Sequence, residues 1–196
     1  MPVPSTAPTI ATERLDLVAM PLGLMKALDS GDRALISALA DFEIPSGFPE
    51  PDEQVLRFRI GDLARDPGSQ RWLVRAIVLR EPARVMIGHI GFHGPPDGDG
   101  RAEIGYTIFS SYRRRGYALE AIEAMFAWAQ KEEGIARFRA AVGPDNVPSL
   151  RLVEKLGFRQ IGTQIDEIDG EELVFELDRV SPPPGRSHGP DFRGAS

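Results

Sequence analysis

Hydrophobic and polar side chains alternate in several short runs of the chain, which is the pattern of β-strands that bury one face. The clearest run is Glu103–Phe109, in which Ile104, Tyr106 and Ile108 alternate with polar or small residues. Similar runs predict six further strands, at residues 13–19, 71–79, 84–93, 137–142, 158–166 and 171–177. The sequence therefore predicts a sheet of about seven strands.

Other segments repeat an apolar residue every three or four positions, as amphipathic helices do. Leu119, Ile122, Phe126 and Ala129 form such a stripe in a segment that begins near Gly116. The same spacing predicts helices at residues 52–65 and 146–156, and two short helices within residues 21–40. This mixture predicts an α+β domain in which one mixed, mostly antiparallel sheet carries helices on both faces.

Turn and cap residues separate these elements. The turn-rich segment 94–100 predicts that strand 84–93 pairs antiparallel with Glu103–Phe109, and Asp169-Gly170 is a favoured two-residue hairpin turn. We expect Asn146 to cap the helix that follows it, and Asp29 or Ser30 to cap the second short helix.

The composition fits one domain in a chain of 196 residues, with 42% hydrophobic and 27% charged residues. We expect this domain at residues 13–180, with a flexible leader at 1–12 and a disordered tail at 181–196. The net charge of -6 argues against nucleic acid as a partner. Because the chain has no cysteine, it has no disulfide, no thiolate metal site and no cysteine acyl-enzyme.

Neither membrane nor metal binding is expected. The chain has no apolar run of the ~20 residues that span a bilayer and no signal peptide, so we expect a cytoplasmic protein. The histidines, His89, His93 and His188, are scattered without the spacing of a metal site.

The segment after strand Glu103–Phe109 has the composition of an anion-binding loop. Free N–H groups at a helix start attract negative charge, a glycine allows close approach to the backbone, and arginines raise the local positive potential. All of these features occur in the six residues Arg113, Arg114, Arg115, Gly116, Tyr117 and Ala118. An ordinary strand-to-helix turn with solvated arginines is the alternative.

This loop resembles the acyl-CoA-binding motif of the GCN5-related N-acetyltransferase (GNAT) family, which reads Gln or Arg, two residues, Gly, one residue, then Gly or Ala. A second block resembles the C-terminal motif of the branch that acetylates ribosomal-protein N-termini (RimJ/RimL type): Asn146, Ser149 and residues 154–158. The resemblance covers about residues 12–180. It implies splayed central strands that bind acyl-CoA, with acetyl-CoA as co-substrate.

The resemblance also implies a reaction, in which a primary amine attacks the thioester directly in a ternary complex. The amine would belong to a protein N-terminus or a small molecule. A tyrosine that protonates the departing thiolate in much of the family is replaced here by Val153, and the resemblance implies that Ser149, one helical turn earlier, stabilises the thiolate. Asn146 would also contact the cofactor, although capping alone would explain it. The carbonyl oxygen would lie at a backbone N–H near Ile108 or Phe109.

Two further residues are candidates for catalysis. Glu103 is the best candidate for a general base acting through a water, and a solvated position at the strand start is the alternative. His93 could face the substrate, as a residue type that titrates near neutral pH, but a lone histidine is more often structural. We expect residues 42–51, the first two helices and the final hairpin to determine substrate choice.

Two alternative functions remain open. The missing tyrosine at Val153 favours an acyl-CoA-binding sensor or interaction module without catalysis, whereas Ser149 and Glu103 favour an enzyme. Another donor such as succinyl-CoA would need only one well-placed arginine. A homodimer is compatible with the resemblance.

Overall fold

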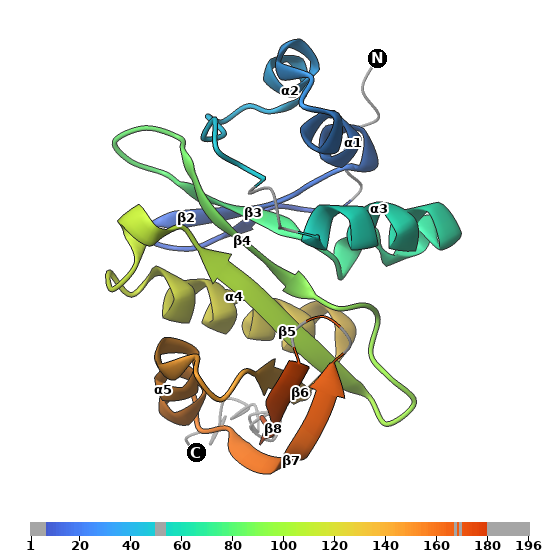
Figure 1. The fold of residues 1–196 in the computed structure, drawn as a ribbon, viewed down its shortest axis with the longest axis vertical. Coiled ribbons are helices and arrows are strands. Elements are labelled where there is room, and N and C mark those ends of the chain that lie inside the picture. The colour runs from blue at the N-terminus through green and yellow to red at the C-terminus, as the bar shows by residue number, and fades with distance from the viewer. Residues whose placement is uncertain (1–6, 50–53, 167, 169, 180–196) are drawn as a thin grey trace, which may run out of the picture.

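An eight-stranded sheet, in the order β1-β2-β3-β4-β5-β6-β8-β7, runs through the part of the chain that the computed structural model describes, residues 7–49, 54–166, 168 and 170–179 (Figure 1). The strands are β1 (Ile10–Ala11), β2 (Leu15–Ala19), β3 (Arg75–Leu79), β4 (Met86–Phe92), β5 (Arg101–Ile108), β6 (Arg137–Val142), β7 (Arg159–Asp166) and β8 (Gly170–Asp178). The α-helices are α1 (Leu22–Ser30), α2 (Arg33–Leu39), α3 (Val55–Arg65), α4 (Tyr117–Glu133) and α5 (Val147–Lys155).

The sheet is mixed and mostly antiparallel, which confirms the predicted fold class. Among the strands that the structure describes, β5 and β6 are the one parallel pair. The described strands number eight rather than about seven because β1, two residues long, pairs antiparallel with β2. A strand this short shows no alternation in its sequence. It lies within the predicted leader, of which residues 7–12 are described. The predicted tail, residues 181–196, lies outside the described residues.

Two apolar layers hold the helices on opposite faces of the sheet. Side chains of β3 show the division, because Ile77 packs in the layer under α4 and α5, whereas Ala76 and Val78 pack in the layer under α1, α2 and α3. The α4 stripe is buried as predicted at Ile122, Phe126 and Ala129 (0–1% exposed), and half-buried at Leu119. The expectation of helices on both faces is confirmed.

Local interactions shift three of the predicted boundaries. The strand predicted from residue 71 begins at Arg75, because residues 67–71 form a 3-10 turn in which the Asp66 side chain accepts a hydrogen bond from the Gly68 N–H. The N-cap of α2 is Asp32, whose carboxylate accepts from the Leu35 N–H, and neither Asp29 nor Ser30. Gly170 is the first residue of β8 and pairs with Asp166, so it lies in the strand rather than in the turn.

Candidate active site

The central strands β5 and β6 diverge soon after they meet. They pair only at residues 101–103 of β5 and 137–139 of β6, while β5 stays paired with β4 as far as Ile108 and β6 stays paired with β8 throughout. Beyond Glu103, a gap therefore opens between two strands in the middle of the sheet. This is the splay of the central strands that the resemblance to the GNAT family implies.

Backbone groups of β5 line this gap at every second residue. The N–H of Phe109 donates to the oxygen of Ile87, and the N–H of His93 donates to the oxygen of Glu103. In an antiparallel ladder bonded pairs alternate with non-bonded ones, so the backbone groups of Tyr106 and Ile108 point away from β4 and into the gap. Of the two residues expected near the thioester oxygen, Ile108 has its N–H in the gap, and Phe109 does not.

The arginine-rich loop leads from this gap to the start of α4. Gly116 has φ 82°, a left-handed conformation that glycine adopts without strain, and Arg114 has φ 60°. Among the described residues, no side chain caps α4, so the N–H groups of its first turn, at Tyr117 and Ala118, are available to an anion. Arg113 donates from Nε to the oxygen of Ile108 (2.9 Å), which ties the loop to the end of β5.

Arg14, which the sequence reasoning missed, holds the loop from the outside. Its guanidinium pairs with Glu120 in the first turn of α4 (2.6 Å), donates to the oxygen of Arg115 (3.0 Å) and lies 4.7 Å from the centre of the Tyr117 ring. These three contacts connect the N-terminal strands to both sides of Gly116. No sequence signal marks Arg14, because its partners are about a hundred positions away.

A hydroxyl pair bridges β5 and α5 beside the gap. The phenol of Tyr106 donates to the Oγ atom of Ser149 at 3.0 Å, and both residues are half-buried. Asn146 caps α5 as predicted, with its side-chain oxygen accepting from the Ser149 N–H at 3.3 Å. Val153 is buried in the apolar layer. Burial raises the pKa of Tyr106 despite the contact with Ser149, so the phenol stays protonated at neutral pH.

A second polar group surrounds Glu103. Its carboxylate lies 3.3 Å from Nδ1 of His93 and 3.5 Å from Nε of Arg139, whose guanidinium also donates to Gln164 on β7 (2.6 Å). The hydrogen bond from His93 lowers the pKa of Glu103, outweighing its burial, and Arg139 adds to this effect. The structure therefore brings Glu103 and His93 together, and Glu103 is ionised at neutral pH. His89 is instead buried, with its ring 5.9 Å from that of Phe48.

The two polar groups lie on opposite faces of β5. Ile104 and Ile108 pack in the layer under α4 and α5, and Tyr106 follows them at the same period of two. Glu103 and Gly105 alternate with these residues and face the side of α1, α2 and α3. A group held in the gap would therefore meet the Tyr106 and Ser149 hydroxyls from one face, and Glu103 with His93 from the other.

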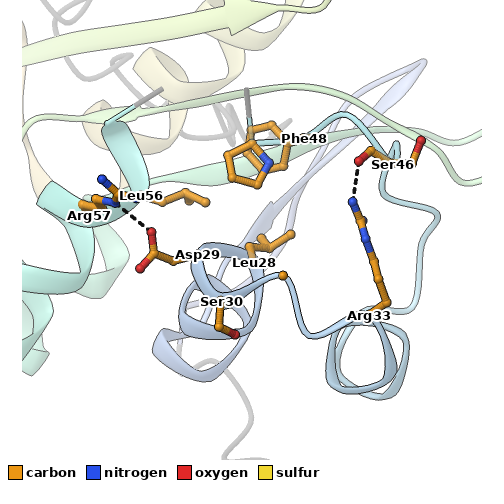
Figure 2. Close-up of a pocket in the computed structure, with 10 residues that line it drawn as sticks. Leu28, Asp29, Ser30, Arg33, Ser46, Phe48, Leu56 and Arg57 are labelled. Carbon is orange, nitrogen blue, oxygen red and sulfur yellow. Dashed lines mark hydrogen bonds and ion pairs between the residues drawn. The ribbon is translucent and has the colours of Figure 1, made fainter. Parts of the chain in front are cut away.

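A pocket of about 330 Å³ lies on the Glu103 side, between α1, α3 and the loop before residue 50. Figure 2 shows Asp29 paired with Arg57 (2.9 Å), and Arg33 donating to the oxygen of Ser46. The Phe48 ring lies 5.5 Å from that of Phe109, so this pocket adjoins the end of β5. It is lined by Leu28, Asp29, Ser30, Gly31, Arg33, Ser46, Phe48, Pro49, Leu56 and Arg57. The first two helices and the loop that we expect to determine substrate choice thus meet at this pocket.

Within the described ranges, no three or more His, Asp or Glu side chains are grouped so that they could hold a metal ion. None of the described helices combines the length and the apolar character needed to cross a membrane.

Known proteins identify the family to which this chain belongs. The model of the acetyltransferase (GNAT) domain family matches residues 24–159. The uncharacterized N-acetyltransferase YjdG of Bacillus subtilis is 32% identical over 154 residues, which cover 76% of this chain and 88% of YjdG. The chain belongs to the GNAT family, and its class is that of the N-acyltransferases.

Solved structures share the fold. A ribosomal-protein-serine acetyltransferase described as putative, from Vibrio cholerae, superposes with a TM-score of 0.60 at 21% identity, covering 87% of this chain and 97% of the other. The ribosomal L7/L12 α-N-protein acetyltransferase RimL, in complex with coenzyme A, superposes with a TM-score of 0.58 at 16% identity, covering 87% and 98%. Structural neighbours thus include the RimJ/RimL type, and GNAT acetyltransferases use acetyl-CoA.

Proposed function

We propose that this protein transfers an acetyl group from acetyl-CoA to a primary amine, at a protein N-terminus or on a small molecule, by direct attack in a ternary complex. The observation that carries this proposal is the placement of two polar pairs on opposite faces of β5, at a gap in the sheet. Such an arrangement separates the place where a leaving group departs from the place where an amine loses its proton.

The loop residues would hold acetyl-CoA as the acyl donor. Its phosphates suit the uncapped N-terminus of α4 and the arginines at 113–115, because both attract negative charge. The N–H groups of Tyr106 and Ile108 face the gap, where they suit the carbonyl groups along the extended pantetheine arm and the thioester of acetyl-CoA. The N–H of Ile108 is the donor that would stabilise charge on the thioester oxygen during attack.

Glu103 and His93 would prepare the amine. An ammonium ion is not a nucleophile, so one proton must leave before attack. Glu103 is ionised and accepts a hydrogen bond from the Nδ1–H group of His93. The lone pair on Nε2 of His93 is therefore free to take the proton of the amine, directly or through a water. The nitrogen then forms its bond to the acetyl carbon, the carbon–sulfur bond breaks with its electron pair going to sulfur, and the nitrogen releases its second proton to water on the Glu103 side. Ser149, on the other face, donates a hydrogen bond to the departing thiolate.

The pocket beside Phe48 would receive part of the acceptor. Asp29 supplies a carboxylate and Arg33 and Arg57 supply cations, so the lining suits a polar acceptor rather than an apolar one. A cationic amine and an amino-acid-like acceptor both match this lining.

The test is the release of CoA thiol from acetyl-CoA, measured across a panel of amines and N-terminal peptides. We expect turnover with one acceptor class, and a fall of about 100-fold or more in kcat for Glu103→Gln with acetyl-CoA binding retained. Tight binding of acetyl-CoA without turnover on any acceptor would overturn the proposal in favour of a non-catalytic sensor. Turnover that is faster with succinyl-CoA than with acetyl-CoA would instead show that succinyl-CoA is the donor.

A further inference from the structure

Tyr106 carries a hydroxyl on the apolar face of β5. Its neighbours on this face, Ile104 and Ile108, are buried in the layer under α4 and α5, and Tyr106 packs against the same layer. A polar group placed there needs a partner, since an unsatisfied hydroxyl costs free energy. The partner that the structure provides is Ser149, at 3.0 Å.

The direction of this hydrogen bond determines what Ser149 can do. A serine hydroxyl has one hydrogen to donate and two lone pairs to accept with. A phenol is the more acidic of the two hydroxyls and so is the better donor; with Tyr106 donating to Oγ, one lone pair of Ser149 is occupied and its own hydrogen is available to another acceptor. Burial keeps the phenol protonated, so Tyr106 remains a donor across the neutral range.

The two hydrogen bonds that Ser149 makes with Tyr106 and Asn146 do not use that hydrogen. Ser149 lies in the first turn of α5, where its N–H is already taken by the Asn146 side chain. Its Oγ meets the phenol of Tyr106, a residue whose backbone lines the gap between β5 and β6. An acceptor atom in the gap is therefore the natural partner for the Ser149 hydroxyl.

We infer that Tyr106 is a positioning residue, which holds the Ser149 hydroxyl with its hydrogen directed at the sulfur atom of CoA. This inference rests on the proposed function. In the reaction, the electron pair of the carbon–sulfur bond leaves with the sulfur, and the thiolate accepts a hydrogen bond from Ser149 without taking its proton. The thiolate is protonated by solvent after release, and both protons that the ammonium loses, one before the attack and one after it, leave on the Glu103 side. Tyr106 neither gains nor loses a proton in this step.

The first test compares kcat and KM of Tyr106→Phe, Ser149→Ala and the double variant in the thiol-release assay. Phenylalanine retains the ring and removes only the hydroxyl. We expect kcat of Tyr106→Phe to fall roughly three- to tenfold, the worth of one hydrogen bond, with KM for acetyl-CoA unchanged. The double variant should be no slower than Ser149→Ala alone, because Tyr106 acts only through Ser149. Additive losses, or an unchanged kcat in Tyr106→Phe, would overturn the inference.

A second measurement needs no acceptor and so separates this inference from the proposed function. Affinities for CoA and for desulfo-CoA, which lacks the sulfur, are compared by calorimetry at about pH 8.5, where a thiol is partly ionised. We expect the wild type to prefer CoA, and Tyr106→Phe and Ser149→Ala to lose this preference to the same degree. Thr163→Val, which removes an exposed hydroxyl from β7, should keep it.

The outcomes of the second measurement are distinct. A sulfur preference that depends on Tyr106, found together with no turnover on any amine, supports the inference and defeats the proposed function. Equal preference in wild type and Tyr106→Phe, or no binding of CoA by the wild type, defeats the inference.

Discussion

The Nδ1 atom of His93 lies 3.3 Å from the Oε1 atom of Glu103, where the end of β4 meets β5. The backbone fixes this contact, because the His93 N–H donates to the Glu103 oxygen at 2.8 Å and so places the two residues directly opposite each other. Arg59 of α3 also holds His93, because its guanidinium donates a hydrogen bond to the backbone oxygen of His93 at 2.9 Å. The pair is thus a product of strand register, and its consequences can be measured.

The acid stability of the protein should depend on Glu103. Contact with His93 lowers the pKa of Glu103 in the folded state below its ordinary value of 4.5. The ionised carboxylate therefore stabilises the fold above pH 4.5, and this contribution is lost as the pH falls through the lower folded-state pKa. Urea unfolding at a series of acidic pH values should show a shallower loss of stability for Glu103→Gln than for the wild type. Parallel curves would contradict the assignment.

Gly105→Ala should separate His93 from Glu103 without unfolding the protein. A Cβ atom at Gly105 would lie 2.6 Å from Nε2 of His93, so the imidazole must move, and it can, because that side chain is 52% exposed. We expect kcat to fall toward the value of His93→Ala, while the free energy of unfolding changes by less than about 1 kcal/mol. Gly162→Ala on β7, with open space around it, is the matched control. Unchanged kcat in Gly105→Ala would remove His93 from the site.

Gly116→Ala should weaken acetyl-CoA binding. Its φ of 82° would cost an alanine about 1–2 kcal/mol, and relief of this strain would move the loop away from α4. Gly134→Ala at the end of α4 has a φ of 69° and so carries a similar backbone cost away from the loop. Both variants should lose similar stability in thermal unfolding, but only Gly116→Ala should raise KM for acetyl-CoA. An equal KM in the two variants would rule out a role for this glycine in donor binding.

Arg14→Ala should also raise KM for acetyl-CoA, by several-fold, with a smaller effect on kcat. Loss of its contacts with Glu120, Arg115 and Tyr117 frees both sides of the loop at once. Arg159→Ala removes an exposed arginine paired with Asp178 on the far edge of the sheet, and should leave KM unchanged. Steady-state kinetics with acetyl-CoA varied make this comparison, and identical KM values would show that the loop holds its shape without Arg14.

Asp29→Asn should alter acceptor binding alone. Asp29 is the carboxylate among the residues that line the pocket, and its pairing with Arg57 is exposed and worth little stability. We expect KM for a cationic acceptor to rise several-fold, with KM for acetyl-CoA unchanged. If no acceptor in the panel responds, the pocket does not contribute to acceptor binding.

Local sequence was sufficient to predict the elements that form the proposed donor side. The loop from Arg113 to Ala118 and the Asn146 cap depend on residues within a few positions of one another, and strand β6 was predicted with its observed bounds, Arg137–Val142. Alternation along β5 also assigned its residues to two sets, which are its two faces in the structure.

Long-range pairing could not be predicted in the same way. Tyr106 meets Ser149 across 43 positions, and Arg14 meets Glu120 across 106. These contacts depend on which strands are neighbours and on the register between them, which no local pattern encodes. From the sequence alone, Tyr106 is therefore only an apolar position of a strand. The choice between Ile108 and Phe109 likewise required the observed register of β4 with β5.

The divergence of β5 from β6 gives the sheet a third edge, inside the molecule. Amide hydrogens of Tyr106 and Ile108 lie along this inner edge, so we expect them to exchange with deuterated solvent as quickly as those of an outer strand. Those of Gly105 and Thr107 point toward β4 and should exchange slowly. A molecule that binds along the inner edge would slow exchange at Tyr106 and Ile108 and leave exchange at Gly105 and Thr107 unchanged. Exchange along this one strand would therefore report binding and also provide the internal control.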